Sequence, residues 1–529
     1  MKLYVYILAL ATLLIQSGCT KSPEPKPELP AIVHQAHLTD GWYPQNPEKL
    51  TQSLDQYFAN AQKYFEVPVN TADVKAIIVP HAGHFYSGLC AATAYQALRG
   101  NTTINRVIIL SPAHTAFYNG IALPDYTMYR TVLGDIPVDI EACNILKKDS
   151  LFRPYATAHA TEHAIEIQLP FLQKTLSSFS IVPLVVGHLT PEDPLLASKL
   201  LKKIITDKTL IVISSDFVHH GARFDYELVD KNRIGHVRLL DSLAIEALGR
   251  QSYNEFDTLL QQTNATICGR EALKILLALL GRGDLGQLRA TVGCYYTSPQ
   301  RQEQKETGSI KKLFQLPDDT STDSSVSYAS MIYSTPQQLK THEQLLTGYE
   351  KQALLTMVRA LIRNTFQPKD KQLDERLLFP IKSPGLMLPA GAFVTLNTKQ
   401  GELRGCIGRI MTRDPLYQTV AAMSLASAFN DTRFQPLTAQ ELDNVIIDIT
   451  VLTPPHKVAG YQDIQIGKHG IILTKQGHSA VFLPQVARDN HWTIETTLEH
   501  LSRKAGLPAD AWKQGCDFEV FEGFEIKED

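Results

Sequence analysis

The chain has 529 residues, too long for a single hydrophobic core, and suggests two to four domains at roughly 150 residues each. A hydrophobic content of 44% and a charged content of 20% are ordinary for globular proteins and argue against a largely disordered or membrane-embedded chain. The formal net charge of −3 leaves no basic field, so the composition gives no support for a nucleic-acid-binding protein.

The N-terminus reads as an export signal. Lys2 precedes an apolar run from Leu3 to Ile15, and small residues follow, ending in Gly18-Cys19. The run is too short for a membrane-spanning helix, which needs about 20 apolar residues, and is typical of a secretory signal. Gly18-Cys19 resembles the end of a bacterial lipobox, in which the cysteine is lipidated. Residues 1–19 are therefore predicted to be a lipoprotein-type signal peptide; a plain signal peptide with an incidental Cys19 is the alternative.

Residues 20–33 follow as a polar, proline-rich segment, with Lys21-Ser22-Pro23-Glu24-Pro25-Lys26-Pro27 at its centre. Such a segment has no core to bury and predicts an extended tether. Thr20, rather than Asp, follows the cysteine. The lipoprotein resemblance therefore implies a protein exported to the bacterial cell envelope and anchored there by lipid, on the periplasmic side of the outer membrane if the source is Gram-negative.

A low-complexity stretch divides the rest of the chain. Residues Pro317 to Ser334 contain an Asp/Ser/Thr run and few apolar residues, which predicts an interdomain linker at 316–339. The linker separates a first domain at 34–315 from a second at 340–529.

In the first domain, short apolar runs alternate with helical patterns such as Leu89–Leu98 and Arg238–Leu248. The runs are rich in β-branched residues and do not alternate with polar ones, which is typical of strands buried on both faces of a parallel or mixed sheet. They are Val74–Val79, Arg106–Leu110, Ile181–Val186 and Leu210–Ile213. This alternation of strand and helix predicts the α/β class.

Each predicted strand is followed by histidine or aspartate. The residues concerned are His81, His114, His188, and Asp216 with His219 and His220. Ligands of open α/β sheets bind just beyond the carboxyl ends of the strands. One histidine there is more often an ordinary loop residue, but four strands that each deliver such a group predict one shared site. Imidazoles with one anionic ligand suit iron or copper, which we expect here, and also zinc.

Cys268 is the candidate for the anionic ligand. It precedes a helical pattern from Glu271 to Leu280. The helix N-terminus and the neighbouring Arg270 are expected to lower the pKa of the thiol, making it reactive or metal-binding. The alternative is a small buried hydrophobic residue, as most free cysteines are.

A second candidate lies in the segment Thr161–Leu172, whose apolar residues have helical spacing. Glu162, His163 and Glu166 crowd its first turn, where His163 is placed to act as an acid or base. An ordinary solvated helix face with charge pairing is the alternative.

Several motifs, in order along the chain, cover nearly the whole first domain. They are Gly41-Trp42-Tyr43-Pro44, Pro80-His81-Ala82-Gly83, Tyr86-Ser87-Gly88, Glu162-His163-Ala164-Ile165-Glu166, Ser214-Ser215-Asp216-Phe217 and Ile267-Cys268-Gly269. Together they resemble the MEMO family. The resemblance implies the fold of class III non-haem iron extradiol dioxygenases of the LigB type. It also implies a metal site of His81, His114 and Cys268, with His163, Asp216 and His219 lining the same pocket.

Two departures qualify this resemblance. His84 stands where the family usually has tyrosine, which is expected to alter the pocket wall. The dioxygenases use two histidines and a carboxylate, whereas the third ligand here is Cys268. A thiolate favours softer metals and changes the electronics of iron, so ring cleavage does not follow from the fold.

The second domain mixes strands and helices without regular alternation, which predicts a smaller α+β domain. Its pattern has a helix at Leu354–Phe366 and strands at Gly391–Leu396 and Val445–Leu452, and the segment Leu403–Gly408 follows the first strand after a Gln-Gly turn. Its motifs resemble the AMMECR1 family, which implies a fold but no established reaction. They are Leu403-Arg404-Gly405-Cys406-Ile407-Gly408, Asp431-Thr432-Arg433-Phe434, Gly467-Lys468-His469-Gly470, Phe482-Leu483-Pro484-Gln485-Val486 and Lys504-Ala505-Gly506-Leu507.

Cys406, between Arg404 and two glycines, is a candidate nucleophile, because glycines permit the close approach of a ligand. In the favoured alternative, the segment is a strand-end turn in which Gly405 and Gly408 serve backbone geometry and Cys406 is packed. Arg433, Lys468 and His469 are hypothesised to share a cleft with it.

Three functions remain open. The first is a metal-dependent redox enzyme of the non-haem iron type, in which His163 or His219 moves protons for an unidentified small molecule and Asp216 orients a histidine. The second is a non-catalytic metal-binding protein, suited to copper. The third is a module that binds a peptide or protein.

The family resemblances also imply a radical SAM partner, through a grouping called the AmmeMemoRadiSam system. An exported chain does not meet a cytoplasmic enzyme, so the predicted export and this partnership exclude each other.

Overall fold

The computed structural model describes residues 31–228, 233–315, 324–336, 346–379 and 381–528. The predicted signal peptide at 1–19 and nearly all of the predicted tether at 20–33 lie outside these residues. Within the described part of the chain, no helix is both long enough and apolar enough to cross a membrane.

The first domain is built on a nine-stranded mixed sheet with the order β10-β12-β2-β9-β3-β8-β4-β7, and β11 pairs with β12. Its central strands β2, β9, β3 and β8 run parallel. In chain order the strands of this sheet are β2 (Val74–Val79), β3 (Arg106–Pro112), β4 (Ile121–Leu123), β7 (Phe152–Pro154), β8 (Ser180–Val186), β9 (Thr209–Ser214), β10 (His219–Gly221), β11 (Arg289–Thr297) and β12 (Ser324–Ser334). The four predicted strands and the predicted mixed α/β class are confirmed.

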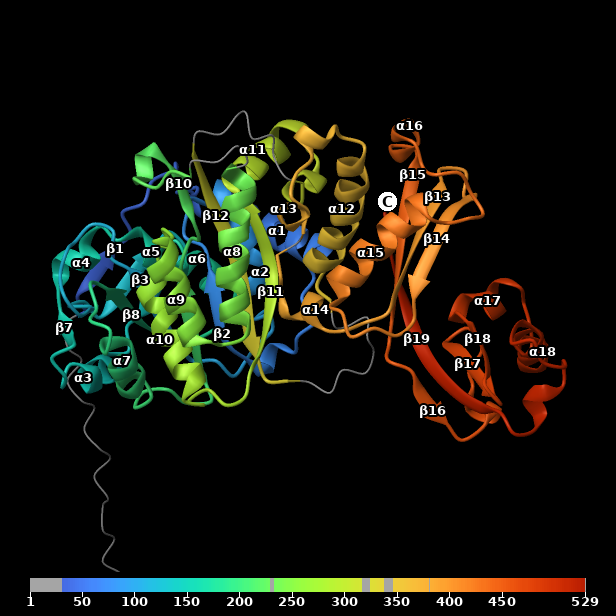
Figure 1. Ribbon diagram of the computed structural model, residues 1–529. Coiled ribbons are helices and arrows are strands. Elements are labelled where there is room, and N and C mark those ends of the chain that lie inside the picture. The colour runs from blue at the N-terminus through green and yellow to red at the C-terminus, as the bar shows by residue number, and fades with distance from the viewer. Residues whose placement is uncertain (1–30, 229–232, 316–323, 337–345, 380, 529) are drawn as a thin grey trace, which may run out of the picture.

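Helices cover both faces of this sheet (Figure 1), and α10 packs on β3 and β9 while α2 packs on β2, β11 and β12. The longer ones are α1 (Pro47–Tyr64), α2 (His84–Gln96), α7 (Asp193–Leu201), α8 (Arg233–Gly249), α9 (Tyr253–Thr263), α10 (Arg270–Gly281) and α11 (Ser298–Thr307). Short helices are α3 (Ile140–Leu146), α4 (Ala156–Ala160), α5 (His163–Glu166), α6 (Leu169–Thr175) and the 3-10 turn η3 (Ile310–Leu313). A small sheet of β1 (Val33–Gln35), β5 (Met128–Thr131) and β6 (Gly134–Pro137) lies apart.

The linker prediction at 316–339 is wrong for its central part. Residues 324–334 form β12, which pairs with β11 on one side and with β2 on the other. Ala329, Met331 and Tyr333 are fully buried there. The Asp/Ser/Thr run ends where this strand begins, and the prediction extended the polar run across the apolar residues that follow. The first domain therefore reaches Ser334 rather than ending at 315.

The second domain has a seven-stranded sheet with the order β14-β13-β15-β19-β17-β18, and β16 pairs with β19. Its strands are β13 (Ala392–Thr398), β14 (Leu403–Arg409), β15 (Val445–Leu452), β16 (His456–Val458), β17 (His469–Lys475), β18 (His478–Phe482) and β19 (Asp517–Lys527). Its helices are α12 (Gly348–Thr365), α13 (Glu375–Leu378), α14 (Pro384–Met387), α15 (Leu416–Phe429), α16 (Ala439–Leu442), α17 (Pro484–Asp489) and α18 (Ile494–Lys504). The predicted helix and the two predicted strands are confirmed, and the segment 403–408 forms a third strand, β14.

Helix α12 joins the two domains. In Figure 1 it stands between β11 of the first domain and α15 of the second, and it packs on both. Tyr349 and Ala353, in its first turns, belong to the core of the first domain, whereas Leu354 and Val358 belong to a core of the second. The Gly348 N–H donates to Glu66 O at 2.9 Å, which fixes the start of the helix on the first domain.

Candidate metal centre

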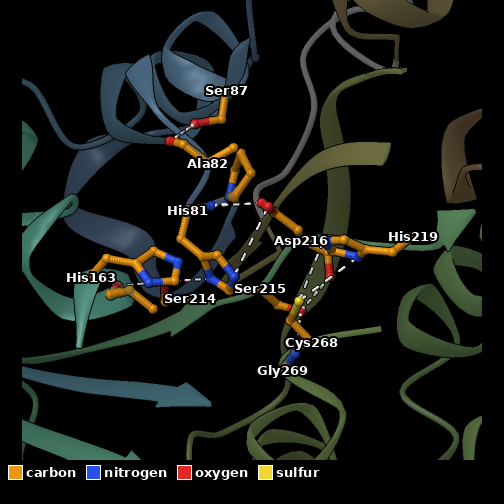
Figure 2. Close-up of polar contacts among 12 residues, drawn as sticks. His81, Ala82, Ser87, His163, Ser214, Ser215, Asp216, His219, Cys268 and Gly269 are labelled. Carbon is orange, nitrogen blue, oxygen red and sulfur yellow. Dashed lines mark hydrogen bonds and ion pairs between the residues drawn. The ribbon is translucent and has the colours of Figure 1, made fainter. Parts of the chain in front are cut away.

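Three neighbouring strand ends bring together the predicted polar residues. Strand β9 lies between β2 and β3, so the residues that follow these parallel strands meet at one edge of the sheet. The His81 N–H donates to Asp216 Oδ1 at 2.7 Å, and the rings of His81 and His114 lie 5.0 Å apart. Figure 2 shows His81 between His163 and Asp216, with Cys268 below Asp216 in this view and His219 to its right.

The fourth strand does not contribute, which corrects the prediction for His188. After β8 the chain turns to pair with the segment around Asn119, and His188 forms a β-bridge with that residue. The His188 side chain is exposed. Strand β8 has antiparallel β4 as its outer neighbour, and this pairing leads the chain away from the site.

Cys268 reaches the site from the start of α10. Gly269, the N-cap of that helix, lies so close to the Asp216 turn that a Cβ atom would stand 2.5 Å from Ser215 Cβ. The Gly269 N–H donates to Ser215 Oγ at 3.0 Å. This close packing of glycine against the end of β9 holds the preceding cysteine beside Asp216.

His81, His114 and Cys268 form one grouping in which the potential ligand atoms all lie within 4.8 Å of one another. His81 Nδ1 lies 3.1 Å from Ser214 Oγ, whereas its buried Nε2 has no hydrogen-bond partner among the described residues. Asp216 Oδ2 is 4.0 Å from that Nε2 atom. An inward-facing, unpaired imidazole nitrogen is the state that a metal ligand requires.

Glu162 holds His114, a role that the sequence did not reveal. This buried carboxylate accepts from the His114 N–H at 2.7 Å and lies 2.8 Å from His114 Nδ1. Because His114 Nδ1 is bonded to Glu162, Nε2 is the nitrogen that remains free to bind a metal ion. His114, Glu162 and His163 make a second grouping of possible ligands, and the rings of the two histidines lie 4.4 Å apart. The Glu162-His163 motif was the available signal, but it pointed to His163.

His163 and His219 flank the grouping from opposite sides. His163 opens α5, and its ring packs against Trp42 with the ring centroids 4.6 Å apart. Burial lowers the pKa of His163 to about 4. His219 Nδ1 is 2.9 Å from Phe217 O, and its Nε2 lies 3.6 Å from Cys268 Sγ. Burial also lowers the pKa of His219, so both imidazoles are neutral at pH 7.

Burial is the largest cause of the pKa shifts of the other titratable groups at the site. It lowers the pKa of His81 and raises the pKa of Asp216 to about 7. The prediction of a lowered pKa for Cys268 is wrong. Burial, followed by the charges of Asp216 and Glu162, raises the pKa of this thiol and outweighs Arg270. A buried thiol beside carboxylates loses its proton only when another positive charge compensates it.

Two residues near the site, Glu166 and His84, stabilise the fold around it. Glu166 accepts from Tyr43 Oη at 2.6 Å and from the backbone N–H of His37, tying the segment with Trp42 to α5. His84, expected to alter the pocket wall, is 2% exposed and packs on Tyr43 and Phe171. The segment predicted as one helix at 161–172 divides into α5 and α6, with residues 167 and 168 between them.

Cys406, the candidate nucleophile, lies within the edge strand β14 rather than at a strand-end turn. The Thr395 hydroxyl donates to its Sγ at 3.3 Å, and among the described residues no histidine or carboxylate bonds to the thiol. Gly405 is required for packing, because a Cβ there would stand 2.3 Å from Ser427 O. This geometry favours the packing interpretation of the glycine over ligand access.

The AMMECR1-like motif around Asp431 bonds to the backbone of this edge strand at Cys406. Asp431 Oδ2 accepts from the Cys406 N–H at 2.9 Å, and Arg433 Nη2 donates to Cys406 O at 3.0 Å. Lys468 pairs instead with Glu522, and His469 Nδ1 accepts from the Gln465 N–H. The hypothesised cleft therefore keeps Arg433, whereas Lys468 and His469 are bonded elsewhere.

Asp448, on β15 opposite Thr395, yields a pH-dependent prediction. Its Oδ1 is buried without a hydrogen-bond partner among the described residues, and burial followed by the charge of Glu525 raises its pKa to about 6 from 3.8. Because the folded pKa is the higher one, this group costs stability as pH rises from about 4 to about 6. Solvent screens the half-buried side chain, so Asp448→Asn is expected to raise the unfolding free energy by about 1 kcal/mol at pH 8.

Urea unfolding at pH 4 and pH 8 measures this effect. The gain should vanish at pH 4, where aspartate is protonated in both states. Asp370→Asn, at an exposed position with no comparable burial, is the control and should change neither value. A gain of equal size at both pH values would show that the charge is not responsible.

Comparison with known proteins identifies both parts of the chain. The family described as Memo-like protein matches residues 35–332, more than half of the sequence. The chain belongs to the Memo-like family. The AMMECR1 family matches residues 355–526, so a Memo-like domain is fused to an AMMECR1 domain. Both resemblances drawn from the motifs are confirmed, and the Memo-like match includes most of β12.

Relatives of this Memo-like chain include proteins from animals and from an archaeon. Protein MEMO1 of Xenopus tropicalis is 34% identical over 256 residues, covering 47% of this chain and 84% of that protein. Protein MEMO1 of Homo sapiens is 32% identical over 258 residues, covering 46% and 84%. Protein NEQ441 of Nanoarchaeum equitans is 37% identical over 183 residues, covering 33% and 99%. The solved structure of the uncharacterized protein PH0010 from Pyrococcus horikoshii has 31% identity and a TM-score of 0.30, covering 33% and 90%.

Proposed function

We propose that the Memo-like domain is a metal-dependent redox enzyme of the non-haem iron type, with a dioxygenase-like fold, acting on a small molecule. The observation that carries this proposal is the convergence of His81, His114 and Cys268, whose potential ligand atoms lie within 4.8 Å of one another.

The donor set fits a transition metal. His81 presents a buried nitrogen without a partner, and Glu162 fixes His114 so that one nitrogen remains available. Two imidazoles and one thiolate suit iron, copper or zinc, and the thiolate favours the softer ions among them. A bound cation would also compensate the charge of the Cys268 thiolate, which burial otherwise opposes. When bound, such a metal supplies Lewis acidity and, for iron or copper, electron transfer.

The surrounding residues are suited to hold and move protons. His163 and His219 are neutral imidazoles on opposite sides of the grouping, and His163 contacts His114 directly. Asp216 holds the backbone N–H of His81 and thereby positions that ring. His114 is exposed, which gives a substrate a way to reach the site. A protein that only stores metal has no need of flanking acid–base groups, and this favours catalysis over buffering.

Metal analysis of the purified chain tests the proposal. We expect about one transition-metal ion per chain in the wild type and at least a tenfold loss in His81→Ala and in Cys268→Ala. His188→Ala, which removes an exposed histidine after β8, is the matched control and should keep the metal. Equal metal content in wild type and both site variants would contradict the proposed ligands. Oxygen consumption with catechols then separates an enzyme from a metal-binding protein, because only an enzyme turns over.

We also propose, from the N-terminal sequence, that the chain is exported and held at the membrane through lipidated Cys19. Replacing Cys19 with serine should move the protein from the membrane fraction to the soluble fraction. Wild-type protein in the cytoplasm would contradict export and would restore the radical SAM partner as a candidate.

A further inference from the structure

A cavity of about 770 Å³ lies along α12, between the two domains and outside the metal centre. Residues of α12 from Tyr349 to Asn364 form its floor, and Gln367 lies just beyond the end of the helix. The first domain contributes Arg238 from α8, and Lys311, Phe314 and Gln315 from η3 and its continuation. The second domain closes the other end with residues near Lys399, Val445 and Glu528.

The lining of this cavity is cationic. It includes six basic side chains and two acidic ones: Arg238, Lys311, Arg359, Arg363, Lys371 and Lys399, against Asp443 and Glu528. Both acids are already paired, Asp443 with Arg363 at 2.7 Å and Glu528 with Arg359. Among the described residues, none of the other four basic side chains forms a salt bridge, although the charge of Arg238 acts on nearby Asp241. A concave surface with this excess of positive charge attracts anions.

Arg238 is the buried member of this set. It is 9% exposed, and its Nε has no hydrogen-bond partner in the described part of the chain. Asp241, one helical turn further along α8, interacts with it electrostatically. However, the two carboxylate oxygens of Asp241 accept hydrogen bonds from the Val218 N–H at 3.0 Å and from the Tyr295 hydroxyl at 2.8 Å. A buried donor without an acceptor is destabilising, so Arg238 Nε is a donor that a bound anion would satisfy.

Aromatic rings stand beside this guanidinium. The Arg238 guanidinium carbon lies 5.6 Å from the centre of the Tyr295 ring. Tyr349 and Phe314 line the cavity with their ring centroids 5.8 Å apart, and Lys311 lies three residues before Phe314 on η3. One end of the cavity thus combines a buried arginine, a lysine and two flat apolar surfaces. Arginine binds phosphate through two parallel hydrogen bonds, which makes phosphate the anion that suits this end best.

We propose that this interdomain cavity binds a phosphate-bearing small molecule, with Arg238 and Lys311 contacting the phosphate. The ligand would touch α8 and η3 of the Memo-like domain and α12 of the AMMECR1 domain together, so its binding strengthens their association. The site is independent of the proposed metal chemistry.

Calorimetric titration of the full chain with pyrophosphate, in 150 mM salt, tests the site. We expect saturable binding that weakens at least tenfold in Arg238→Met and severalfold in Lys311→Met. Lys312→Met is the matched control, because the neighbouring Lys312 pairs with Glu303 at 3.3 Å and does not line the cavity. The His81→Ala variant should bind pyrophosphate like the wild type. Loss of binding in that variant would assign the anion to the metal centre and overturn the proposal.

Thermal unfolding supplies a second readout. Without ligand, Arg238→Met should melt at the wild-type temperature or below it, because methionine keeps the packing but removes the positive charge that interacts with buried Asp241. Pyrophosphate should raise the melting temperature of the wild type and leave Arg238→Met unchanged. Absence of saturable binding to the wild type, or equal affinity in wild type and Lys311→Met, would overturn the proposal even if Arg238→Met failed to fold.

Discussion

A chain comprising residues 31–315 is expected not to fold, although the composition of residues 316–325 suggests a natural boundary. Such a chain lacks β12, which pairs along most of its length with β11 and also with β2. Met331, Ile332 and Tyr333 are 0% exposed. Removing one such side chain costs about 2–5 kcal/mol, so losing the strand exceeds the roughly 5–15 kcal/mol by which a domain is stable. Circular dichroism and thermal unfolding of the purified fragment measure this directly.

A fragment of residues 31–336 is the matched control. It keeps β12 and loses the contacts of the second domain with the first, among them those that Tyr349, Ala353 and Ile381 make with the first core and the hydrogen bond from Gly348 to Glu66. We expect it to unfold cooperatively, at a lower temperature than the same domain in the full chain. A cooperative transition in the 31–315 fragment equal to that of the longer one would refute the structural role assigned to β12.

Glu162→Gln is expected to weaken metal binding by about 10- to 100-fold while leaving all three proposed ligands in place. The carboxylate holds both the backbone N–H and the Nδ1 of His114, and it lies 3.5 Å from His163 Nδ1. Burial alone would raise the pKa of Glu162, but the hydrogen bonds from His114 lower it overall, so the group is ionised at pH 7. Glutamine keeps the size but loses the charge that fixes the ring. Competition with a metal chelator gives the affinity.

Glu166→Gln separates positioning from general destabilisation. Glu166 is also a buried carboxylate, four residues further on, but it holds His37 and Tyr43 rather than a proposed ligand. This variant should lower the unfolding temperature and retain the metal affinity of the wild type. If both variants lose metal in parallel with stability, Glu162 acts on the fold and not on His114.

The sequence was most informative where burial is uniform. The four strands that form the parallel centre of the first sheet were visible as unbroken apolar runs, since both faces of each strand are covered. The order of these strands was not visible. It is this order, with β9 between β2 and β3, that brings Asp216 beside His81 and places His188 elsewhere.

Other errors share a cause, because composition and local charge do not report tertiary burial. The sequence predicts a linker where serine-rich β12 lies, because the strand begins with polar residues and its apolar residues come later. The pKa of Cys268 was expected to fall because Arg270 and a helix start are adjacent in sequence. Burial and two carboxylates that are distant in sequence decide it instead. Glu162 acts on a residue 48 positions away, and sequence spacing offers no guide to such a contact.

We propose Cys268 as a metal ligand together with His81 and His114. X-ray absorption spectroscopy of the metal-loaded chain tests it most directly. We expect one sulfur scatterer, at about 2.3 Å if the metal is zinc, together with nitrogen ligands at about 2.0–2.1 Å. In Cys268→Ser the sulfur contribution should disappear while the nitrogen ligands remain. A wild-type spectrum with only nitrogen and oxygen ligands would contradict the account and would favour the alternative grouping of His114, Glu162 and His163.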